Sequence, residues 1–226
     1  MHQGVVDQTT LTTMTFFYWG LGATGVLLSL WAGYTTIFEG GLGQPEYTVT
    51  ERMDHGEIRQ YPPFLVALTQ PSIDGDDGLR EGFRTLAGYI FGGNKPQEKL
   101  AMTAPVIQQN NTGESLPMTA PVLTGSQEMM MAFVMPAGRT KEDLPVPNSS
   151  NVQLEEVDWG AVAAITFAGR GKQHRFVEHE KRLRALIEQH GRKARAPALY
   201  AQYNSPTAFP PLRRNEVLIP LQPKAD

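Results

Sequence analysis

The longest stretch without a charged residue is the feature that most constrains this chain. No Asp, Glu, Lys or Arg occurs between Asp7 and Glu39. Inside that interval, residues 16–38 are predominantly apolar, and a helix of this length can cross a hydrocarbon core about 30 Å thick. Aromatic residues stand near both ends of the segment, as they do at membrane interfaces. The sequence therefore predicts one transmembrane helix over residues 16–38.

Two other interpretations of this segment are possible from its composition. A cleaved signal peptide fits less well, because no Lys or Arg precedes the apolar run and no small-residue cleavage site follows it. A buried core helix is the other alternative. Arg52 and Arg59 follow the segment, and no basic residue precedes it. The positive-inside rule therefore favours a single-pass membrane protein with a cytoplasmic C-terminal domain.

The anchor divides the rest of the chain into simple parts. Residues 1–15 are an N-terminal tail, residues 39–45 a short flexible linker rich in Gly, and residues 223–226 a C-terminal tail. Residues 46–222 then form one domain of ordinary size.

Composition excludes several functions. The net charge is −3 and both signs are spread along the chain, so nothing indicates a nucleic-acid partner. Cysteine is absent, which excludes disulfides, thiolate metal sites, Cys nucleophiles and covalent c-type haem.

Hydrophobic patterning predicts an α+β domain. A helix is expected with an apolar stripe over residues 79–90 and a stop at Gly92-Gly93-Asn94. A second helix is expected from 173 to 190, with Gly191 beyond its end. The expected strands cover residues 47–50, 57–61, 64–68, 100–109, 116–123, 129–135, 152–157, 161–167, 198–204 and 216–221, with a loop at 144–148. Strands, helix, strands therefore occur twice, which suggests a duplicated unit and an antiparallel sheet backed by two helices.

An exact repeat marks the middle of the chain. Met-Thr-Ala-Pro-Val occurs at 102–106 and again at 118–122. Proline cannot donate to a strand ladder, so each copy is expected at a sheet edge or a bulge.

These landmarks together resemble the SOUL haem-binding protein family. The matching stretches, in family order, are Glu57-Ile-Arg-Gln-Tyr-Pro-Pro63, residues 83–94, both Met-Thr-Ala-Pro-Val copies, Phe133-Val-Met-Pro136, Leu144-Pro-Val-Pro147 and Arg213-Arg-Asn-Glu-Val217. The resemblance covers residues 46–221. It implies two βαββ-like repeats that form a distorted antiparallel barrel. It also implies non-covalent binding of haem or a related tetrapyrrole at an apolar surface near the first helix.

Candidate site residues follow from that expectation. Haem needs an apolar slot and cations for its two propionates. The first helix and its exit offer Leu79, Phe83, Arg84, Leu86, Tyr89 and Lys95.

An iron ligand is not identified. His55, His174 and His179 are weak candidates. His55 lies in an expected turn. His174 and His179 are five residues apart, about 140° round a helix, so they do not share a face. Met102 and Met118 are expected to pack rather than to ligate iron.

The first hypothesis is a non-enzymatic module that binds or buffers haem at a membrane. The alternative is a membrane-held interaction module that uses the same surface for another apolar ligand or for a protein, whose identity the sequence does not indicate. An enzyme is the third hypothesis, but no nucleophile, base and orienting group can be assembled.

Overall fold

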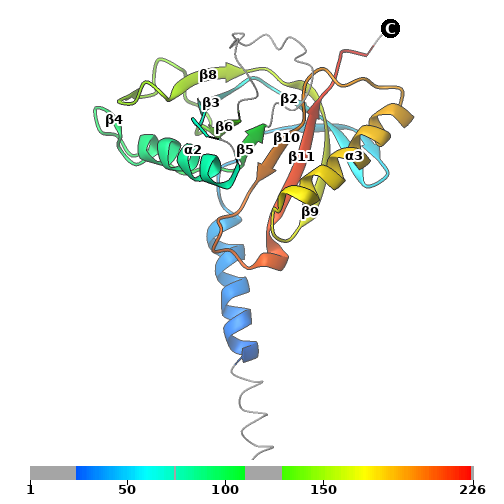
Figure 1. Cartoon of the computed structure of the whole chain (residues 1–226), viewed down its shortest axis with the longest axis horizontal. Coiled ribbons are helices and arrows are strands. Elements are labelled where there is room, and N and C mark those ends of the chain that lie inside the picture. Colours follow the sequence, from blue (N-terminus) through cyan, green and yellow to red (C-terminus); the bar gives the residue numbers. More distant parts are fainter. Residues whose placement is uncertain (1–23, 74, 110–128, 225–226) are drawn as a thin grey trace, which may run out of the picture.

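The computed structural model describes residues 24–73, 75–109 and 129–224 of the chain. In this part, nine antiparallel strands form one strongly curled sheet, two helices cover one of its faces, and a helical stalk projects from the domain (Figure 1). The strands of the large sheet are β1 (Thr48–Met53), β2 (Gly56–Tyr61), β3 (Phe64–Thr69), β5 (Val106–Gln109), β6 (Met130–Val134), β8 (Gln153–Val157), β9 (Gly160–Ala168), β10 (Leu199–Gln202) and β11 (Arg214–Pro220). The other elements are α2 (Gly75–Ile90), α3 (Gln173–Gln189), a ribbon of β4 (Asn94–Lys95) with β7 (Val146–Pro147), and the short helices η1 (Thr35–Glu39) and η2 (Pro210–Leu212).

The strand order reveals an internal symmetry. The sheet runs β1-β2-β9-β11-β10-β5-β6-β3-β8, and β10 and β5 pair at its centre. On one side β10, β11 and β9 follow one another, and on the other side β5, β6 and β3 do the same. The next strand on each side comes from the other half of the sequence, since β2 pairs with β9 and β8 pairs with β3. This order agrees with the expected duplication. The sheet has free edges at β1 and β8, so it is a curled half-barrel rather than a closed barrel.

Alternation along the strands separates two faces. On β11, Val217 and Ile219 join the core under α3, whereas Leu218 joins a core on the opposite face of the sheet. Helix α3 packs on β9 and β11, and α2 packs in the equivalent place on β3 and β6. The face without helices has its own apolar core, which includes Tyr61 and Trp159.

Both helices end where the sequence predicted. After α2 the chain turns at Gly92, whose φ of 106° suits glycine. The Asn94 side chain then closes the exit by donating to the carbonyl oxygens of Tyr89 and Glu98, both at 2.8 Å. Helix α3 ends at Gln189, and Gly191 follows just beyond its end with a φ of 63°. Asp76 and Asp77 stand in the first turn of α2, where negative charge favours the helix dipole.

The expectation for residues 100–109 was partly wrong. Strand β5 begins only at Val106, directly after Pro105, because the ladder starts where backbone N–H groups are present again. Strand β5 is also central rather than at an edge, because it pairs with β10 on one side and β6 on the other. The second Met-Thr-Ala-Pro-Val copy and the strand expected at 116–123 lie outside the described residues. The loop expected at 144–148 contains the short strand β7.

The stalk consists of a helix over 24–34 that continues into η1. No helix in the described part of the chain is both long and apolar enough to span a membrane, and the first residues of the expected anchor precede that part. The residues expected as a linker contact the domain. Gly43 accepts a hydrogen bond from the Ala104 amide at 2.8 Å, and the Gln44 side chain accepts one from Arg214 at 3.1 Å.

Candidate functional site

Part of the site expected on α2 is buried in the core. Leu86 and Tyr89 are buried in the cluster between α2 and the sheet, and Leu79 packs against that cluster half-buried. The Tyr89 hydroxyl donates to the Pro145 carbonyl oxygen at 2.9 Å. These residues therefore hold the helix on the sheet, and the surface of α2 is formed by other side chains.

The outer side of α2 exposes two aromatic rings. Phe83 is 38% exposed and Phe91 is 60% exposed. The Phe91 amide donates to the Ala87 carbonyl oxygen at 3.0 Å, so the helical path continues to Phe91. Phe83, Ala87 and Phe91 are spaced at i, i+4 and i+8 and share one side of the helix. We call this row the outer stripe. Phe91 was not among the residues expected from the sequence.

Open space and positive charge adjoin the outer stripe. Gly88 lies beside it, and a Cβ atom there would meet no atom within 4 Å. Arg84 precedes Gly88 by one turn and is exposed, and Lys95 is exposed just beyond the helix exit. Among the described residues, neither side chain forms an ion pair or a hydrogen bond. Two free cations thus accompany an apolar strip, which is the combination expected for an apolar ligand that carries carboxylates.

The structure does not bring the candidate iron ligands to this surface. His55 lies in the β1–β2 turn with a φ of 61°, next to Asp54. His174 and His179 belong to α3, which lies on the other half of the sheet (Figure 1). The ring of His179 stacks on Phe167 at 4.2 Å and its Nδ1 contacts the Arg175 carbonyl oxygen at 2.8 Å. No group of three potential ligands among His, Cys, Asp and Glu occurs in the described ranges. Met102 is 37% exposed, and Met118 lies outside the described residues.

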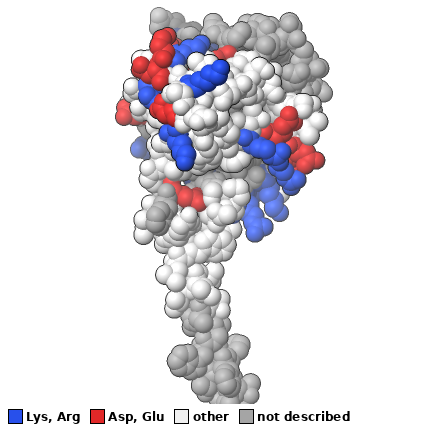
Figure 2. All heavy atoms as spheres, turned by 90° about the vertical axis from the view of Figure 1, so that its left-hand side faces the viewer, with Lys and Arg blue, Asp and Glu red and all other residues white. Residues whose placement is uncertain are grey.

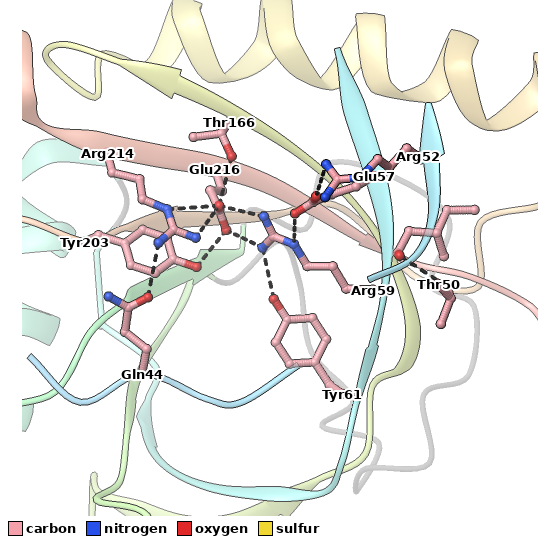
Figure 3. Close-up of polar contacts among 11 residues, drawn as sticks. Gln44, Thr50, Arg52, Glu57, Arg59, Tyr61, Thr166, Tyr203, Arg214 and Glu216 are labelled. Atoms are coloured by element: carbon pink, nitrogen blue, oxygen red, sulfur yellow. Dashed lines mark hydrogen bonds and ion pairs between the residues drawn. The ribbon is translucent and has the colours of Figure 1, made fainter. Parts of the chain in front are cut away.

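A second polar cluster lies on the face without helices (Figure 3). Arg59 of β2 and Glu216 of β11 form a two-pronged ion pair, with N–O distances of 2.8 and 2.9 Å, although their side chains are only 2% and 0% exposed. Arg214 donates to the same carboxylate at 2.7 and 3.1 Å. Tyr203 and Thr166 complete the shell with hydroxyl bonds of 2.6 and 2.9 Å. Because every second residue of a strand faces the same way, Arg214 lies on the same face of β11 as Glu216 and reaches its carboxylate.

Charge neutralisation explains the protonation states in this cluster. Burial alone would raise the pKa of Glu216, but Arg59 and Arg214 hold it at about 2. Burial also opposes the charged form of Arg59, yet the bonds to Glu216 raise the pKa of that guanidinium. Desolvation raises the pKa of Tyr61, which accepts a bond from Arg59, to about 12. The carboxylate is ionised and fully paired, so this cluster cross-links β2, β9, β10 and β11 and has no free group for chemistry.

Comparisons with known proteins identify the protein family. The family model described as "SOUL heme-binding protein" matches residues 42–220. Among curated proteins, "Heme-binding protein 2" of Mus musculus is 30% identical over 161 residues, which is 70% of this chain and 74% of that protein. The protein of the same name in Homo sapiens is 29% identical with the same coverage.

Solved structures support the fold alone. An uncharacterised conserved protein from Listeria innocua superposes with a TM-score of 0.53 at 11% identity, covering 76% of this chain and 94% of that one. The EcmrR C-terminal domain gives a TM-score of 0.52 at 10% identity, covering 78% and 98%. The family match spans nearly the whole domain and agrees with the motifs and with the curled α+β sheet. The chain therefore belongs to the SOUL haem-binding protein family.

Proposed function

We propose that this protein binds haem or a related tetrapyrrole non-covalently on the outer stripe of α2. The observation that supports this proposal most is the proximity of exposed Phe83 and Phe91 to Arg84, whose side chain forms no ion pair or hydrogen bond in the described part of the chain. The two rings and the open surface at Gly88 would hold one face of the macrocycle. Arg84 and Lys95 pair with the propionates. Membership of the family and the names of its curated relatives support the choice of ligand.

The apolar contact provides useful but moderate affinity. The exposed parts of Phe83 and Phe91 together equal about one whole Phe side chain, on the order of 200 Å². Covering that area stabilises the complex by about 5 kcal/mol. The loss of translational and rotational freedom offsets much of this gain, while the ligand's own apolar surface and the two cations add to it. We therefore expect a dissociation constant nearer micromolar than nanomolar.

The residues present fit the macrocycle better than they fit the iron. No His of the described chain adjoins the outer stripe, and the Tyr89 hydroxyl is committed to Pro145. Bound haem would supply its own iron and its Soret absorption. The protein's part is to cover one face of the ring and to neutralise its carboxylates. This is a binding or buffering role, and it requires no catalytic residue.

We further propose that residues 16–38 hold the domain at a membrane. On the described stalk, Leu27 is 67% exposed and Ile37 is 74% exposed. Figure 2 shows the stalk without Lys or Arg along its described length, below a domain that carries both signs of charge. The hydroxyls of Ser29, Thr35 and Thr36 donate to carbonyl oxygens four residues earlier, at 2.9, 3.1 and 2.6 Å. Such internal bonding suits a helix in lipid, where water cannot satisfy polar groups.

A titration tests the ligand. Haem and iron-free protoporphyrin are added to the full-length protein in lipid nanodiscs, and binding is followed in the Soret band. We expect saturation at one equivalent for both ligands, because the macrocycle rather than the iron is held. His55→Ala, His174→Ala and His179→Ala are expected to bind as the wild type does. Partition of haem without saturation would contradict the proposal and would favour a surface for a protein or another apolar ligand.

A further inference from the structure

The end of the domain nearest the stalk has an unusual charge pattern. Two segments meet there. One is the β9–α3 turn with the first residues of α3 (169–175), and the other is the η2 region at 205–213; the Gly169 amide donates to the Arg213 carbonyl oxygen at 3.1 Å. We call them together the basal surface. It carries four basic residues and no Asp or Glu. The basic residues are Arg170, Lys172, Arg175 and Arg213.

These charges are only partly used inside the protein. Arg175 donates to the Ala168 carbonyl oxygen at 2.6 Å and Arg213 donates to those of Pro206 and Ala208, so both brace their own turns. Arg170 and Lys172 are exposed, and among the described residues their side chains form no ion pair or hydrogen bond. Burial and the nearby positive charge of Arg170 lower the pKa of Arg213. The like charges are therefore close together. Among the described residues, the Glu39 carboxylate of the stalk partly offsets the charge of Arg213, whereas Arg170 and Lys172 form no ion pair.

The basal surface is fixed to the stalk. The Trp31 indole donates to the Thr207 carbonyl oxygen at 2.8 Å, and its ring meets Phe209 edge-on at 5.0 Å. The Thr35 hydroxyl accepts from the Phe209 amide at 2.8 Å. About one turn further on, the Glu39 carboxylate accepts from both the amide and the hydroxyl of Ser205, at 3.0 and 2.6 Å. In Figure 1 the short helix η2 accordingly lies beside the upper end of the stalk.

This attachment sets the height of the basal surface above a bilayer. Trp31 and Tyr34 belong to the aromatic group at the C-terminal end of the expected span, where such side chains occupy the headgroup region. The 207–209 segment contacts Trp31 and so lies at the same level. Leu212 at the tip of η2 is 47% exposed, an apolar side chain next to a basic cluster. Apolar and basic groups together are typical of protein surfaces that rest on anionic membranes.

We propose that the basal surface docks on the anionic phospholipid headgroups of the membrane that holds the stalk. Arg170 and Lys172 contact the headgroup phosphates, Leu212 enters the boundary of the acyl chains, and Arg175 and Arg213 add positive potential. The inference rests on the membrane attachment proposed above. It adds that the domain has a fixed orientation on the lipid and depends on lipid charge, because the rigid contacts of Trp31 and Glu39 leave little freedom to tilt.

The absence of cysteine permits a direct test. Leu212→Cys in the full-length protein gives a single thiol for an environment-sensitive dye. The labelled protein is placed in vesicles of neutral phosphatidylcholine, with or without phosphatidylglycerol. We expect the emission to shift to the blue only in anionic vesicles and the shift to disappear in molar salt, which shortens the Debye length to about 3 Å. An equal signal in both lipids would overturn the inference.

A matched pair of variants assigns the effect. Arg170→Ser with Lys172→Ser removes two charges from the basal surface, and Ser is a favourable N-cap at position 172 of α3. Lys181→Ser with Lys193→Ser removes two exposed charges farther along the chain. Each basic residue near an anionic surface contributes about a fivefold preference, so the first pair should lose at least about half of the shift. The second pair should retain it. Equal losses in both pairs would contradict a defined docking surface.

Flotation separates this inference from the stalk proposal. Full-length protein that floats with neutral vesicles in molar salt, but shows no dye response to lipid charge, retains the anchor and refutes the docking surface. Protein that floats only with anionic vesicles at low salt supports the docking surface and refutes the anchor. Protein that floats with neither lipid refutes both.

Discussion

Replacing Glu216 with Gln tests the buried cluster most sharply. The amide keeps the size of the side chain but removes the charge that neutralises Arg59 and Arg214. Arg59 is 2% exposed and sits between Glu216 and the Tyr47 ring, whose centroid is 4.2 Å from the guanidinium carbon. It therefore has no route to water. Loss of one partner from such a pair is expected to destabilise the fold, because the other charge remains buried.

The pKa of Glu216 gives the magnitude. A shift from 4.5 to about 2 corresponds to about 3 kcal/mol of folding free energy at neutral pH, within the range of about 3–5 kcal/mol for broken buried pairs. The folded-state pKa is depressed, so this stability is fully present above about pH 4.5. It is lost as the pH falls towards about 2, because the unfolded state takes up the proton first. The difference between the wild type and Glu216→Gln should shrink over that range.

Urea unfolding followed by the fluorescence of buried Trp159 measures this difference. Asp77→Asn is the control, since it removes one partner of the Asp77–Arg80 pair, which is 3.0 Å long but more than two-thirds exposed on both sides. The control should cost less than about 1 kcal/mol. Arg59→Met combined with Glu216→Leu should be less destabilised than Glu216→Gln, because the buried Arg59 charge is removed together with its partner. The remaining Arg214 side chain is 33% exposed and can still be hydrated. A loss below about 1 kcal/mol for Glu216→Gln, or a control with an equal loss, would refute the reasoning.

Three further predictions concern single contacts. Tyr203→Phe deletes the 2.6 Å bond to the Glu216 carboxylate and should cost about 1.5–3 kcal/mol in the same urea assay, and a neutral result would contradict the paired carboxylate. Gly169→Ala should lower the melting temperature, because φ is 101° and a Cβ would approach Arg175 Nη1 to 2.7 Å; unchanged melting would show that the turn relaxes freely. Arg84→Ser should weaken protoporphyrin binding about fivefold without changing stability by more than about 0.5 kcal/mol, since its side chain is exposed. If the affinity were unaffected, Arg84 would not contact the propionates.

Local signals made most of the secondary structure predictable. The spacing of Leu86 and Ile90 and the Gly92-Gly93 exit are contained in adjacent residues, and they located α2. The pairing of β5 with β10 was not predictable in the same way. These strands are about 90 residues apart, and nothing in either one specifies its partner. Pro105 indicated an edge, but only the fold shows that it precedes a central strand.

In the candidate site too, residues with a local signal were predictable and contacts between distant residues were not. Arg84 and Phe83 were predicted because they lie on an amphipathic helix, and both are exposed on α2. Phe91 was missed because the expected apolar stripe ended at Ile90, although the spacing of eight residues between Phe83 and Phe91 was a usable signal. The ion pair of Arg214 with Glu216 is a local contact between two residues of β11. Its larger role depends on Arg59, 157 residues away, which no short motif links to Glu216.

Binding of iron-free protoporphyrin to Phe91→Ser tests the central claim most directly. Phe91 is 60% exposed, so the substitution removes half of the outer stripe with little expected effect on folding. Val177→Ser, at an exposed apolar position of α3, is the matched control. The account predicts about a tenfold or larger loss of affinity for Phe91→Ser and no change for Val177→Ser, since burial of about half a Phe ring contributes more than 1.4 kcal/mol. Equal affinity of both variants and the wild type would show that the tetrapyrrole does not bind on α2.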